Sequence, residues 1–332
     1  MITTNRRTLI NHALATATVA TLPSLVSAQA VPAGWPNKPI RLVVPFAPGG
    51  TSEIVARSVS AELTKQLGVS VFVENKPGGA GVIAMQEVAK APADGYTLIL
   101  GHVGTLAVNP YMLANQPYDV NKDFVPVTLL AKVPSMLAIH PDLPAKDFKE
   151  FIAYAKKNPG KISYGSAGNA SSGHLTMEYL KYVTGTFMLH IPYRGTGPLM
   201  TDLLAGRTQA TFTGAPALGA QIRSGKLRAI AVGTAKRMKT FPDVPTVAEM
   251  GFKDFETSQW YGLQAPAGTP AAIVQKLQEE SLKALKSSAV TERFATDDAI
   301  GGGMTSAEYG AMIAKEQKIW QEIVKKAQIK AD

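Results

Sequence analysis

Short apolar runs alternate with amphipathic stretches along most of this chain, and glycine, proline or aspartate residues separate them. Runs rich in Val, Ile and Leu predict strands, whereas apolar residues that recur every three or four positions predict helices with one buried face. In the first third of the chain the pattern predicts strands at 40–44, 69–73 and 96–100 and helices at 52–67 and 82–89. Strands that alternate with helices are typical of α/β layers on parallel sheets.

A long, weakly polar segment at 125–139 then predicts a strand-like passage between two domains, broken by Pro134. A second series follows, with strands predicted at 162–165, 188–192, 210–213 and 227–232 and helices at 148–157, 175–182 and 198–204. The proline-containing segment 241–251 predicts the return crossing. The last predicted elements are a strand at 260–265 and two helices. The first helix has Thr269 as N-cap and Pro270 in its first turn, with an apolar face from Ile273 to Leu285, and the second opens with a capping box, Thr305 with Glu308.

Two of the predicted strands lead through a glycine-rich turn into a helix, over 40–57 and over 161–180. The first backbone N–H groups of a helix have no internal acceptor, and the helix dipole adds partial positive charge there. Each turn is therefore a candidate site for a carboxylate or phosphate. Two such turns suggest the two halves of one site.

The first thirty residues have the pattern of a cleaved export signal. Arg6 and Arg7 precede an apolar run at 13–26, and the small-x-small sequence at 28–30 predicts cleavage after Ala30. The run is shorter than the ~20 apolar residues of a membrane span, and Pro23 interrupts it. The paired arginines leave twin-arginine export and general secretion both open.

The composition narrows the class of protein further. The chain has 34 Lys and Arg against 25 Asp and Glu, a net charge of +9, which becomes +7 without Arg6 and Arg7. These charges are dispersed singly along helical stretches, without the basic runs and interleaved aromatics of a nucleic-acid-binding protein, so they predict attraction of small anions. With no cysteine in the sequence, disulfides, thiolate metal sites and cysteine catalysis are excluded.

Several motifs together resemble one family. The segment 45–57 reads PFAPGGTSEIVAR, and further motifs follow at 73–78 (VENKPG), 94–98 (DGYTL), 242–246 (PDVPT) and 265–270 (APAGTP). In this order and spacing the chain resembles the extracytoplasmic solute receptors of tripartite tricarboxylate transporters, also called Bug-type receptors. The resemblance covers nearly all of the chain beyond residue 30.

The resemblance implies an α/β type II periplasmic-binding-protein fold, in which two interleaved lobes close on a ligand. It implies a first lobe of 31–132 with 252–332 and a second lobe of 133–251. It further implies a periplasmic monomer without cofactor or enzymatic activity that delivers a small organic carboxylate to membrane permease subunits. A membrane sensor kinase is an alternative partner. Di- and tricarboxylates, aromatic carboxylates and acidic amino acids all remain open as ligands.

The strand ends that should meet at the cleft supply the candidate ligand-binding residues. They are Phe46, Gly49, Gly50, Thr51, Ser52 and Glu53 in the first turn, His102 and Thr105 after the third strand, Ser166, Asn169, Ser171, Ser172 and His174 in the second turn, Tyr193, Arg194 and Gly195, and Thr213, Gly214, Ala215 and Pro216. Thr51 or Ser52 could cap the first helix, and His174 could form a hydrogen bond at a helix start.

Three of these residues have two interpretations each. Glu53 stands where the family usually has Asp; it either serves as a first-turn acidic residue favoured by the helix dipole or faces the ligand. Arg194 either holds a carboxylate in a bidentate fork or is an ordinary surface arginine. His102 either contacts the ligand or satisfies a local backbone group.

The proximity of Ser171 and Ser172 to His174 raises one alternative of another class, an exported hydrolase of carboxylate esters. The G-x-S-x-G motif of a nucleophile elbow is incomplete around these serines, which argues against it. His102, His140, His174 and His190 lack the short spacing of metal ligands, and there is no Walker lysine or G-x-G-x-x-G turn for a nucleotide. We therefore expect neither a metal nor a cofactor.

Overall fold

The computed structural model describes residues 31–253 and 255–329, so the predicted export signal lies outside the described residues. The strands are β1 (Ile40–Val44), β2 (Val71–Asn75), β3 (Thr97–His102), β4 (Phe124–Ile139), β5 (Ser163–Ser166), β6 (Leu189–Pro192), β7 (Ala210–Gly214), β8 (Arg228–Val232), β9 (Ser258–Pro266) and β10 (Ile300–Gly301). The helices are α1 (Thr51–Leu67), α2 (Val82–Ala89), α3 (Asn109–Met112), α4 (Phe148–Lys157), α5 (Ser172–Thr184), α6 (Thr196–Leu204), α7 (Ala215–Arg223), α8 (Ala271–Leu285), α9 (Ser288–Ala295) and α10 (Ser306–Ala327), with a 3-10 turn η1 (Gly79–Gly81) and a π-helical segment η2 (Gly104–Val108).

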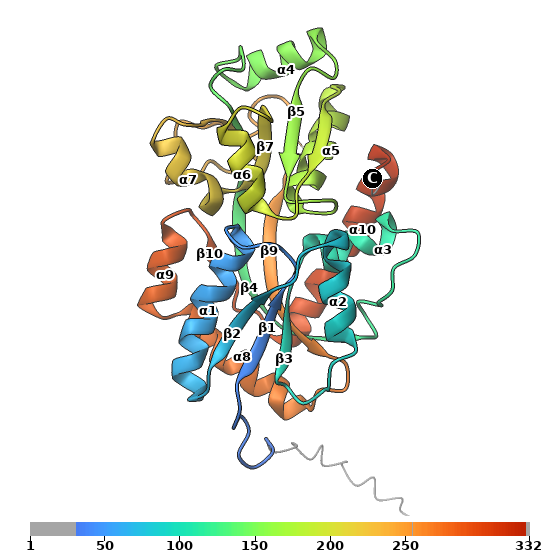
Figure 1. Ribbon diagram of the computed structural model, residues 1–332, viewed down its shortest axis with the longest axis vertical. Helices are drawn as coiled ribbons and strands as arrows, with labels where there is room; N and C mark the ends of the chain where they lie inside the picture. The colour runs from blue at the N-terminus through green and yellow to red at the C-terminus, as the bar shows by residue number, and fades with distance from the viewer. Residues whose placement is uncertain (1–30, 254, 330–332) are drawn as a thin grey trace, which may run out of the picture.

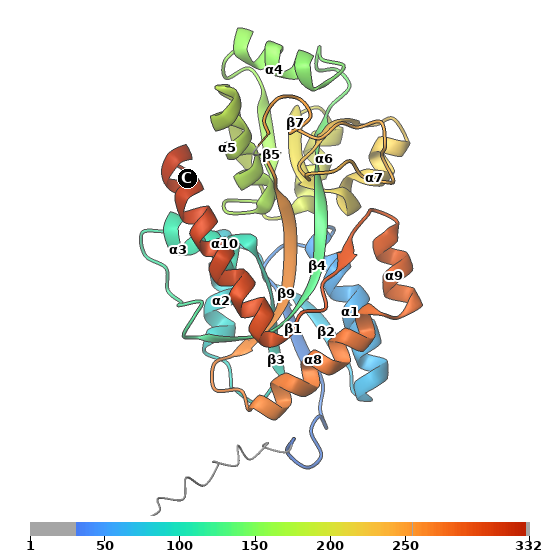
Figure 2. The ribbon, with the colours of Figure 1, turned by 180° about the vertical axis from the view of Figure 1, so that it is seen from behind.

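These elements form two α/β lobes joined by two long strands (Figures 1 and 2). The first lobe holds β1–β3, most of β9, the first part of β4, and helices α1–α3 and α8–α10. The second lobe holds the last part of β4, β5–β8 and helices α4–α7. The chain therefore leaves the first lobe along β4 and returns along β9. The residue bounds that the resemblance implies for the lobes stay a prediction.

The strand order β2-β1-β3-β9-β4-β7-β5-β6 shows how β4 connects the lobes. Its first part pairs antiparallel with β9 up to Pro134 opposite Ser258, and its last part pairs antiparallel with β7 from Ser135 opposite Gly214. Pro134, which has no N–H to donate, thus lies where the strand changes partner. The expected break at this proline is wrong, because β4 is continuous from Phe124 to Ile139.

Each part of the sheet is covered on both faces. In the first lobe one core packs α1, α8 and α9 against the strands, through residues such as Leu63 and Leu277, and a second core packs α2, η2 and α10 through Met85 and Trp320. In the second lobe the equivalent cores lie under α4 and α5 and under α6 and α7. This layering is the α/β architecture that the sequence predicts.

Several predicted elements differ from the structure. The second strand was expected at 69–73 but runs from Val71 to Asn75, because its register is set by pairing with β1, with Ile40 opposite Val71. Thr269 was expected to cap α8, yet the N-cap is Pro270, and the Thr269 hydroxyl donates to Pro266 O instead. Helices α7 and α9 and the short strand β10 were not predicted. The Thr305–Glu308 capping box is confirmed.

One contact joins the lobes just before β10, which pairs with the connecting strand β4. Arg223 at the end of α7 donates to Thr296 O at 3.0 Å, and its Nη2 lies 3.6 Å from Asp297 Oδ1. Thr240 of the second lobe donates from both its N–H and its hydroxyl to Asp298 Oδ2, each at 2.9 Å. We call these bonds the α7–α9 contact; both views show the two helices on the same side of the molecule (Figures 1 and 2).

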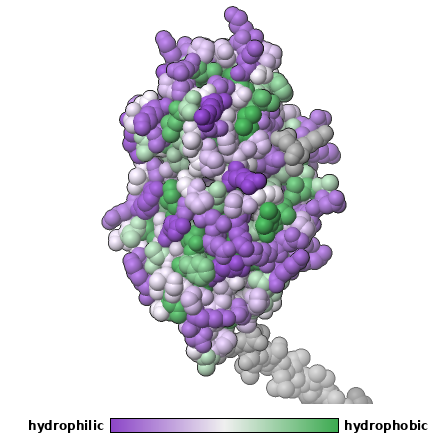
Figure 3. All heavy atoms as spheres, in the orientation of Figure 1, coloured by the Kyte–Doolittle hydropathy of each residue, from purple (hydrophilic) through white to green (hydrophobic). Residues whose placement is uncertain are grey.

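Polar and apolar side chains are interspersed on the face shown in Figure 3. Among the described residues, no helix is both long and apolar enough to cross a membrane.

Candidate ligand-binding site

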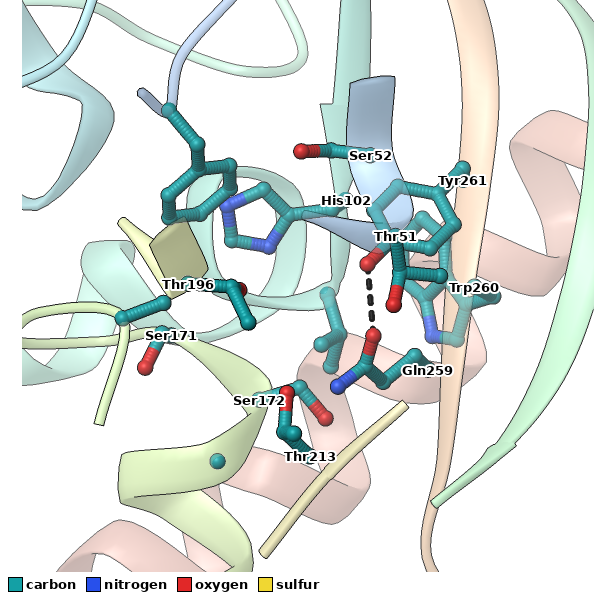
Figure 4. A pocket seen from close by; sticks show the side chains of 14 residues that line it. Thr51, Ser52, His102, Ser171, Ser172, Thr196, Thr213, Gln259, Trp260 and Tyr261 are labelled. Carbon is teal, nitrogen blue, oxygen red and sulfur yellow. Dashed lines mark hydrogen bonds between the residues drawn. The ribbon is translucent and has the colours of Figure 1, made fainter. Parts of the chain in front are cut away.

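A cavity lies between the two lobes where several strands end and helices begin (Figure 4). It has about 370 Å³ of empty space, counting the part open to solvent. Residues of both lobes border it, so it is a space in which the lobes can hold a small ligand. The lining residues are Phe46, Thr51, Ser52, His102, Val103, Ala167, Ser171, Ser172, Gly173, Thr196, Thr213, Gln259, Trp260 and Tyr261.

Three helices begin at this cavity. Thr51 and Ser52 open α1 from the first lobe, while Ser172 opens α5 and Thr196 opens α6 from the second lobe. The first N–H groups of each helix lack an acceptor within the helix, and each N-terminus carries partial positive charge. The two turns predicted from the sequence to bind an anion therefore meet. Helix α6, predicted at 198–204, adds a third helix start, which the sequence analysis did not assign to the site.

The start of α1 differs from the expectation in one respect. Its N-cap is Gly50, which supplies no side-chain cap, so neither Thr51 nor Ser52 caps the helix as predicted. Both are instead the first residues inside the helix, and both are more than nine-tenths buried. Their hydroxyls are consequently available to the cavity that they line.

The start of α5 argues against the hydrolase alternative. Ser171 is the N-cap, and its hydroxyl accepts the backbone N–H of His174 at 3.3 Å. The Nδ1 of His174 accepts the N–H of Ala170 at 3.3 Å, which confirms that this histidine forms a hydrogen bond at a helix start. Its ring stacks on His190 at 4.3 Å, and the residue does not line the cavity.

His102 lines the cavity as a neutral side chain. Its Nδ1 accepts the N–H of Gly104 at 2.8 Å, which places the ring proton on Nε2, and its ring lies 4.5 Å from that of Phe46. Complete burial lowers the pKa of His102 to about 3. Thr105, another predicted site residue, lies behind it and exchanges hydrogen bonds with the His102 backbone. His102 can thus offer a hydrogen-bond donor but no positive charge.

Strand β9 forms one wall of the cavity with Gln259, Trp260 and Tyr261. The Tyr261 hydroxyl donates to Gln259 Oε1 at 2.6 Å, as the dashed line in Figure 4 shows. These residues lie on a strand that connects the lobes, at the base of the space that the lobes enclose. Sequence reasoning missed them because they are about 210 positions from Thr51; the one available signal is the polar start, Thr257 to Gln259, of an otherwise apolar strand.

None of the fourteen lining residues carries a charge at neutral pH. Hydroxyl, amide, imidazole and backbone N–H groups instead surround the space. Hydrogen-bond donors of this kind, together with three helix N-termini, can stabilise an anion without a buried ion pair. The described residues also contain no group of three His, Cys, Asp or Glu side chains able to hold a metal ion.

Glu53 holds the first turn in place and does not line the cavity. Its carboxylate accepts the N–H of Gly49 at 2.6 Å and pairs with Arg57 at 2.7 Å. Burial acts to raise the pKa of Glu53, but the bonds from Gly49 and Arg57 outweigh it and lower the pKa. This is the first-turn role that the sequence analysis offered as one interpretation, and the Gly49 N–H is used by the protein itself.

A separate groove between the lobes contains other predicted residues. Asn169, Tyr193 and Arg194 line it together with Phe46, which also borders the cavity. The Tyr193 hydroxyl donates to Asp202 at 2.8 Å, and burial followed by this bond raises the pKa of Tyr193 to about 12. Arg194 is exposed and forms no ion pair within the part of the chain that the structure describes. The structure therefore does not bring these three residues into the closed cavity.

Four more of the predicted residues surround the cavity without lining it, namely Ser166, Gly214, Ala215 and Pro216. Ser166 is fully buried and bonds to His190 Nε2 at 2.6 Å. Gly214 is the N-cap of α7, which begins with Ala215 and Pro216, whereas the sequence suggested a loop. Thr213, the last predicted residue, does line the cavity.

Glycines allow the two lobes to approach closely beside the cavity. The N–H of Ala47 donates to Arg194 O at 3.1 Å, directly across the lobe boundary. A Cβ on Gly195 would lie 2.7 Å from Ala47 Cβ, and one on Gly197 would lie 2.7 Å from Pro48 O. A Cβ on Gly49 would lie 3.4 Å from Gly197 Cα, and one on Gly50 would lie 2.8 Å from Thr196 Oγ1. We call Gly49, Gly50, Gly195 and Gly197 the glycine seam.

A comparison with known proteins identifies the family. The sequence model of the tripartite tricarboxylate transporter family receptor matches residues 55–329. The chain belongs to this family. Three solved structures share its fold over nearly their whole length. The periplasmic binding protein BugD is 36% identical with a TM-score of 0.86, covering 89% of this chain and 99% of BugD.

The two other structures contain ligands. Rpa4515 of R. palustris, solved with adipate, is 36% identical with a TM-score of 0.86, covering 89% of this chain and 99% of that one. MatC (Rpa3494) from Rhodopseudomonas palustris, with bound malate, is 32% identical with a TM-score of 0.84, covering 87% and 100%. The predicted family and fold class are confirmed. The family is one of transporter receptors, and nothing in these comparisons supports the hydrolase alternative.

Proposed function

We propose that this receptor captures a small organic carboxylate between its lobes and presents it, in the closed form, to the membrane subunits of a tripartite tricarboxylate transporter. The observation that carries the proposal is the cavity, in which three helix N-termini and neutral donors from both lobes surround a space without a charged lining residue. Such a space favours an anion that exchanges its water for hydrogen bonds. The adipate and malate bound by two relatives support this ligand class.

The location that follows is the periplasm, as for BugD. We further propose that residues 1–30 direct export and are removed after Ala30, and that the lobes comprise 31–132 with 252–332 and 133–251. The receptor would act as a monomer, with the permease subunits as partners; a membrane sensor kinase is the alternative partner. The family membership supports the transport assignment.

The placement of the predicted residues suggests distinct roles. Thr51, Ser52, Ser172, Thr196 and Thr213 would donate hydroxyl or N–H groups to the ligand, since all line the cavity. Arg194, exposed in the adjoining groove, would attract anions toward the opening because it is the one charged residue among those that line this groove. Glu53 would keep the first turn in its binding conformation.

A thermal-shift and calorimetry screen tests the function. The panel includes succinate, malate, adipate, citrate and benzoate, with glucose and putrescine as uncharged and cationic compounds. At least one carboxylate should bind with a 1:1 stoichiometry, and at 100 times its Kd it should stabilise the protein by about 2.7 kcal/mol. Binding of glucose or putrescine while no carboxylate binds would overturn the proposal.

A matched pair of variants ties that binding to the cavity. Ser172 and Ser288 are both the first residue of a helix, α5 and α9, but only Ser172 lines the cavity. Ser172→Ala should weaken the binding of the carboxylate by about ten- to a hundredfold, the usual effect of one lost hydrogen bond to a charged group. Ser288→Ala should leave the Kd unchanged. Equal effects of the two variants would place the ligand elsewhere.

A further inference from the structure

The charge of this chain is divided unequally between its lobes. Residues 135–251, which contain the elements of the second lobe, have 14 Lys and Arg against seven Asp and Glu, whereas residues 31–134 and 252–332 together have 18 of each. The net charge of +7 that remains without Arg6 and Arg7 therefore belongs wholly to the second lobe. A lobe with such an excess of one sign attracts surfaces of the opposite sign.

Exposed lysines gather at the end of the second lobe that lies opposite the first lobe, where α4 is seen at the top of Figures 1 and 2. Arg228 of β8 donates to Ala145 O at 2.7 Å, which brings the start of β8 beside the loop before α4. None of these lysines forms an ion pair with a described residue. They are Lys146, Lys149, Lys156, Lys157, Lys161 and Lys226.

The acidic residues at this end do not neutralise it. Asp142, Asp147 and Glu150 are three against the six lysines. Asp147 accepts the N–H of Glu150 at 2.8 Å, and Glu150 accepts the N–H of Lys146 at 2.7 Å, so two of the three hold the start of α4. Hydrophilic side chains accordingly project from the top of the molecule in Figure 3, which has the orientation of Figure 1.

An exposed phenylalanine lies among these lysines. Phe187 is 58% exposed, and its carbonyl accepts at 3.0 Å the N–H of Gly160, in the turn between Lys157 and Lys161. Leu189, which is 49% exposed, follows on the edge strand β6. We call the six lysines, Phe187 and Leu189 the basic end. Lysines around exposed Phe and Leu side chains are typical of proteins that lie on an anionic bilayer, where the apolar groups enter the headgroup region.

The composition of the basic end fits a lipid surface better than a fitted protein partner. Lysine is depleted in protein–protein interfaces, in which Arg, Tyr and Trp supply most of the binding energy. The flexible side chain of lysine carries a point charge, which suits a fluid array of phosphates without fixed geometry.

The basic end is also too far from the cavity to serve mainly in attracting the solute. Strand β7 runs from Ala210, paired with Ile139 just before α4, to Thr213 and Gly214 at the cavity. From Ala210 to Thr213 this strand spans about 10 Å. Charges separated by more than about 8 Å are largely screened at physiological salt.

We propose that the basic end binds the anionic lipid headgroups of a bilayer, with Lys157 and Lys161 at the phosphates and Phe187 among the headgroups. The receptor then lies on the membrane by the far end of its second lobe, and the lobe boundary stays clear of the lipid. The contact goes beyond the proposed function, because it requires neither a bound solute nor a permease subunit.

Sedimentation with vesicles tests this contact. The receptor is purified without residues 1–30, since an export signal would itself bind lipid. At about 0.05 M salt it should bind phosphatidylcholine vesicles containing about 30% phosphatidylglycerol at least about tenfold more tightly than vesicles of phosphatidylcholine alone, and about 0.5 M salt should abolish the binding. No binding to the anionic vesicles, or equal binding to both kinds, would overturn the proposal.

Two double variants with the same change of charge locate the contact. Lys157→Gln with Lys161→Gln should weaken binding to the anionic vesicles by about tenfold, because both lysines lie beside Phe187. Lys315→Gln with Lys318→Gln removes two exposed lysines from α10 in the first lobe and should change the binding by less than about twofold. Equal losses would mean that only total charge matters and would overturn the assignment to the basic end.

A pair of alanine variants tests the apolar part of the contact. Phe187→Ala should weaken binding to the anionic vesicles by about fivefold and leave its salt dependence unchanged. The control is Ile300→Ala, because Ile300 is 68% exposed but lies on β10 of the first lobe. It should have no effect. Equal effects of the two variants would overturn the placement of Phe187 among the headgroups.

A protein partner at the same surface would give a different result. If neither kind of vesicle bound the receptor while Lys157→Gln with Lys161→Gln lowered solute uptake by whole cells, the basic end would serve an acidic protein, and the lipid assignment would be overturned. Urea unfolding and the Kd of the carboxylate should be unchanged in every variant, because the substituted residues are exposed and do not line the cavity.

Discussion

One residue of the cavity, His102, is kept neutral by its burial. His102 lines the cavity that we propose as the carboxylate site, where a positive imidazolium would attract an anion. Its Nδ1 instead accepts the Gly104 N–H, and complete burial lowers its pKa to about 3. The side chain thus serves as a neutral donor throughout the physiological pH range.

This buried histidine predicts a pH dependence of stability. Because its pKa is about 3 when folded and about 6.5 when unfolded, the unfolded chain takes up a proton below about pH 6.5 that the folded chain rejects. The contribution of His102 to stability is therefore complete above pH 6.5 and is lost as the pH falls toward 3. The loss should reach about 1.4 kcal/mol per pH unit.

Urea unfolding of the wild type and of His102→Gln between pH 7 and pH 4 measures this slope. The variant should show a slope smaller by about one proton, whatever its absolute stability. In the NMR spectrum the His102 ring signals should not titrate across this range. Parallel slopes in the two proteins would contradict the neutral assignment.

Among the elements, the start of α10 is one that the local sequence predicts, through the capping box of Thr305 and Glu308. The Thr305 hydroxyl accepts the N–H of Glu308 at 3.2 Å, while the Glu308 carboxylate accepts the N–H of Thr305 at 2.8 Å. Thr305→Ala should lower the free energy of unfolding by about 1 kcal/mol, as for other lost N-caps, and should not change ligand affinity. Chemical denaturation and calorimetry measure the two effects.

Thr291→Ala is the comparison variant for this cap. The Thr291 hydroxyl donates to carbonyls of its own helix, α9, and caps nothing. The variant should change stability by less than about 0.5 kcal/mol. A similar loss in both variants would show that the measured cost reflects the threonine hydroxyl in general.

Elements with strong local patterns could be predicted from the sequence, and those set by distant partners could not. Strand β1 and helix α4 have their expected bounds because apolar spacing and turn residues define them. Helix α7 was missed since Pro216 and Gly219 weaken its pattern, and α9 is short and polar. The bounds of β2 depend on pairing with β1, which the local sequence does not contain.

The same distinction applies to the site. The turns at Thr51 and Ser172 could be predicted, because glycines and hydroxyl residues stand next to a helix start in the sequence. Both residues line the cavity. Gln259 and Tyr261 reach the cavity only because β9 returns from the second lobe beside β4. Thr196 is an intermediate case. Its helix was predicted, and Gly195 before it was a usable signal of a helix start, but the place of that start at the cavity was not predicted.

At the scale of the whole molecule, the two lobes can approach each other at the glycine seam only because its residues have no Cβ atom. Gly197 is a helical glycine, so alanine suits its backbone, but an added Cβ would lie 2.7 Å from Pro48 O in the other lobe. Gly197→Ala should leave the unliganded protein as stable as the wild type or slightly more stable. It should weaken the ligand by about tenfold or more, because the overpacked boundary resists closing.

Gly310→Ala is the control, since a Cβ there would meet only the Pro126 side chain, at 3.4 Å, within the first lobe. It should leave ligand affinity unchanged. Small-angle scattering with saturating ligand should show the wild type and Gly310→Ala contracting, and Gly197→Ala contracting less. Undiminished affinity in Gly197→Ala would mean that ligand binding does not require the closed seam.

The α7–α9 contact has a consequence for how tightly any ligand is held. Its bonds among Arg223, Thr240, Asp297 and Asp298 involve no ligand atom, so they favour the closed form even when the cavity is empty. The measured affinity is the affinity of the closed form multiplied by the fraction of empty receptors already closed. Two receptors with identical cavities can therefore retain the same solute for different times, according to a few residues outside the cavity.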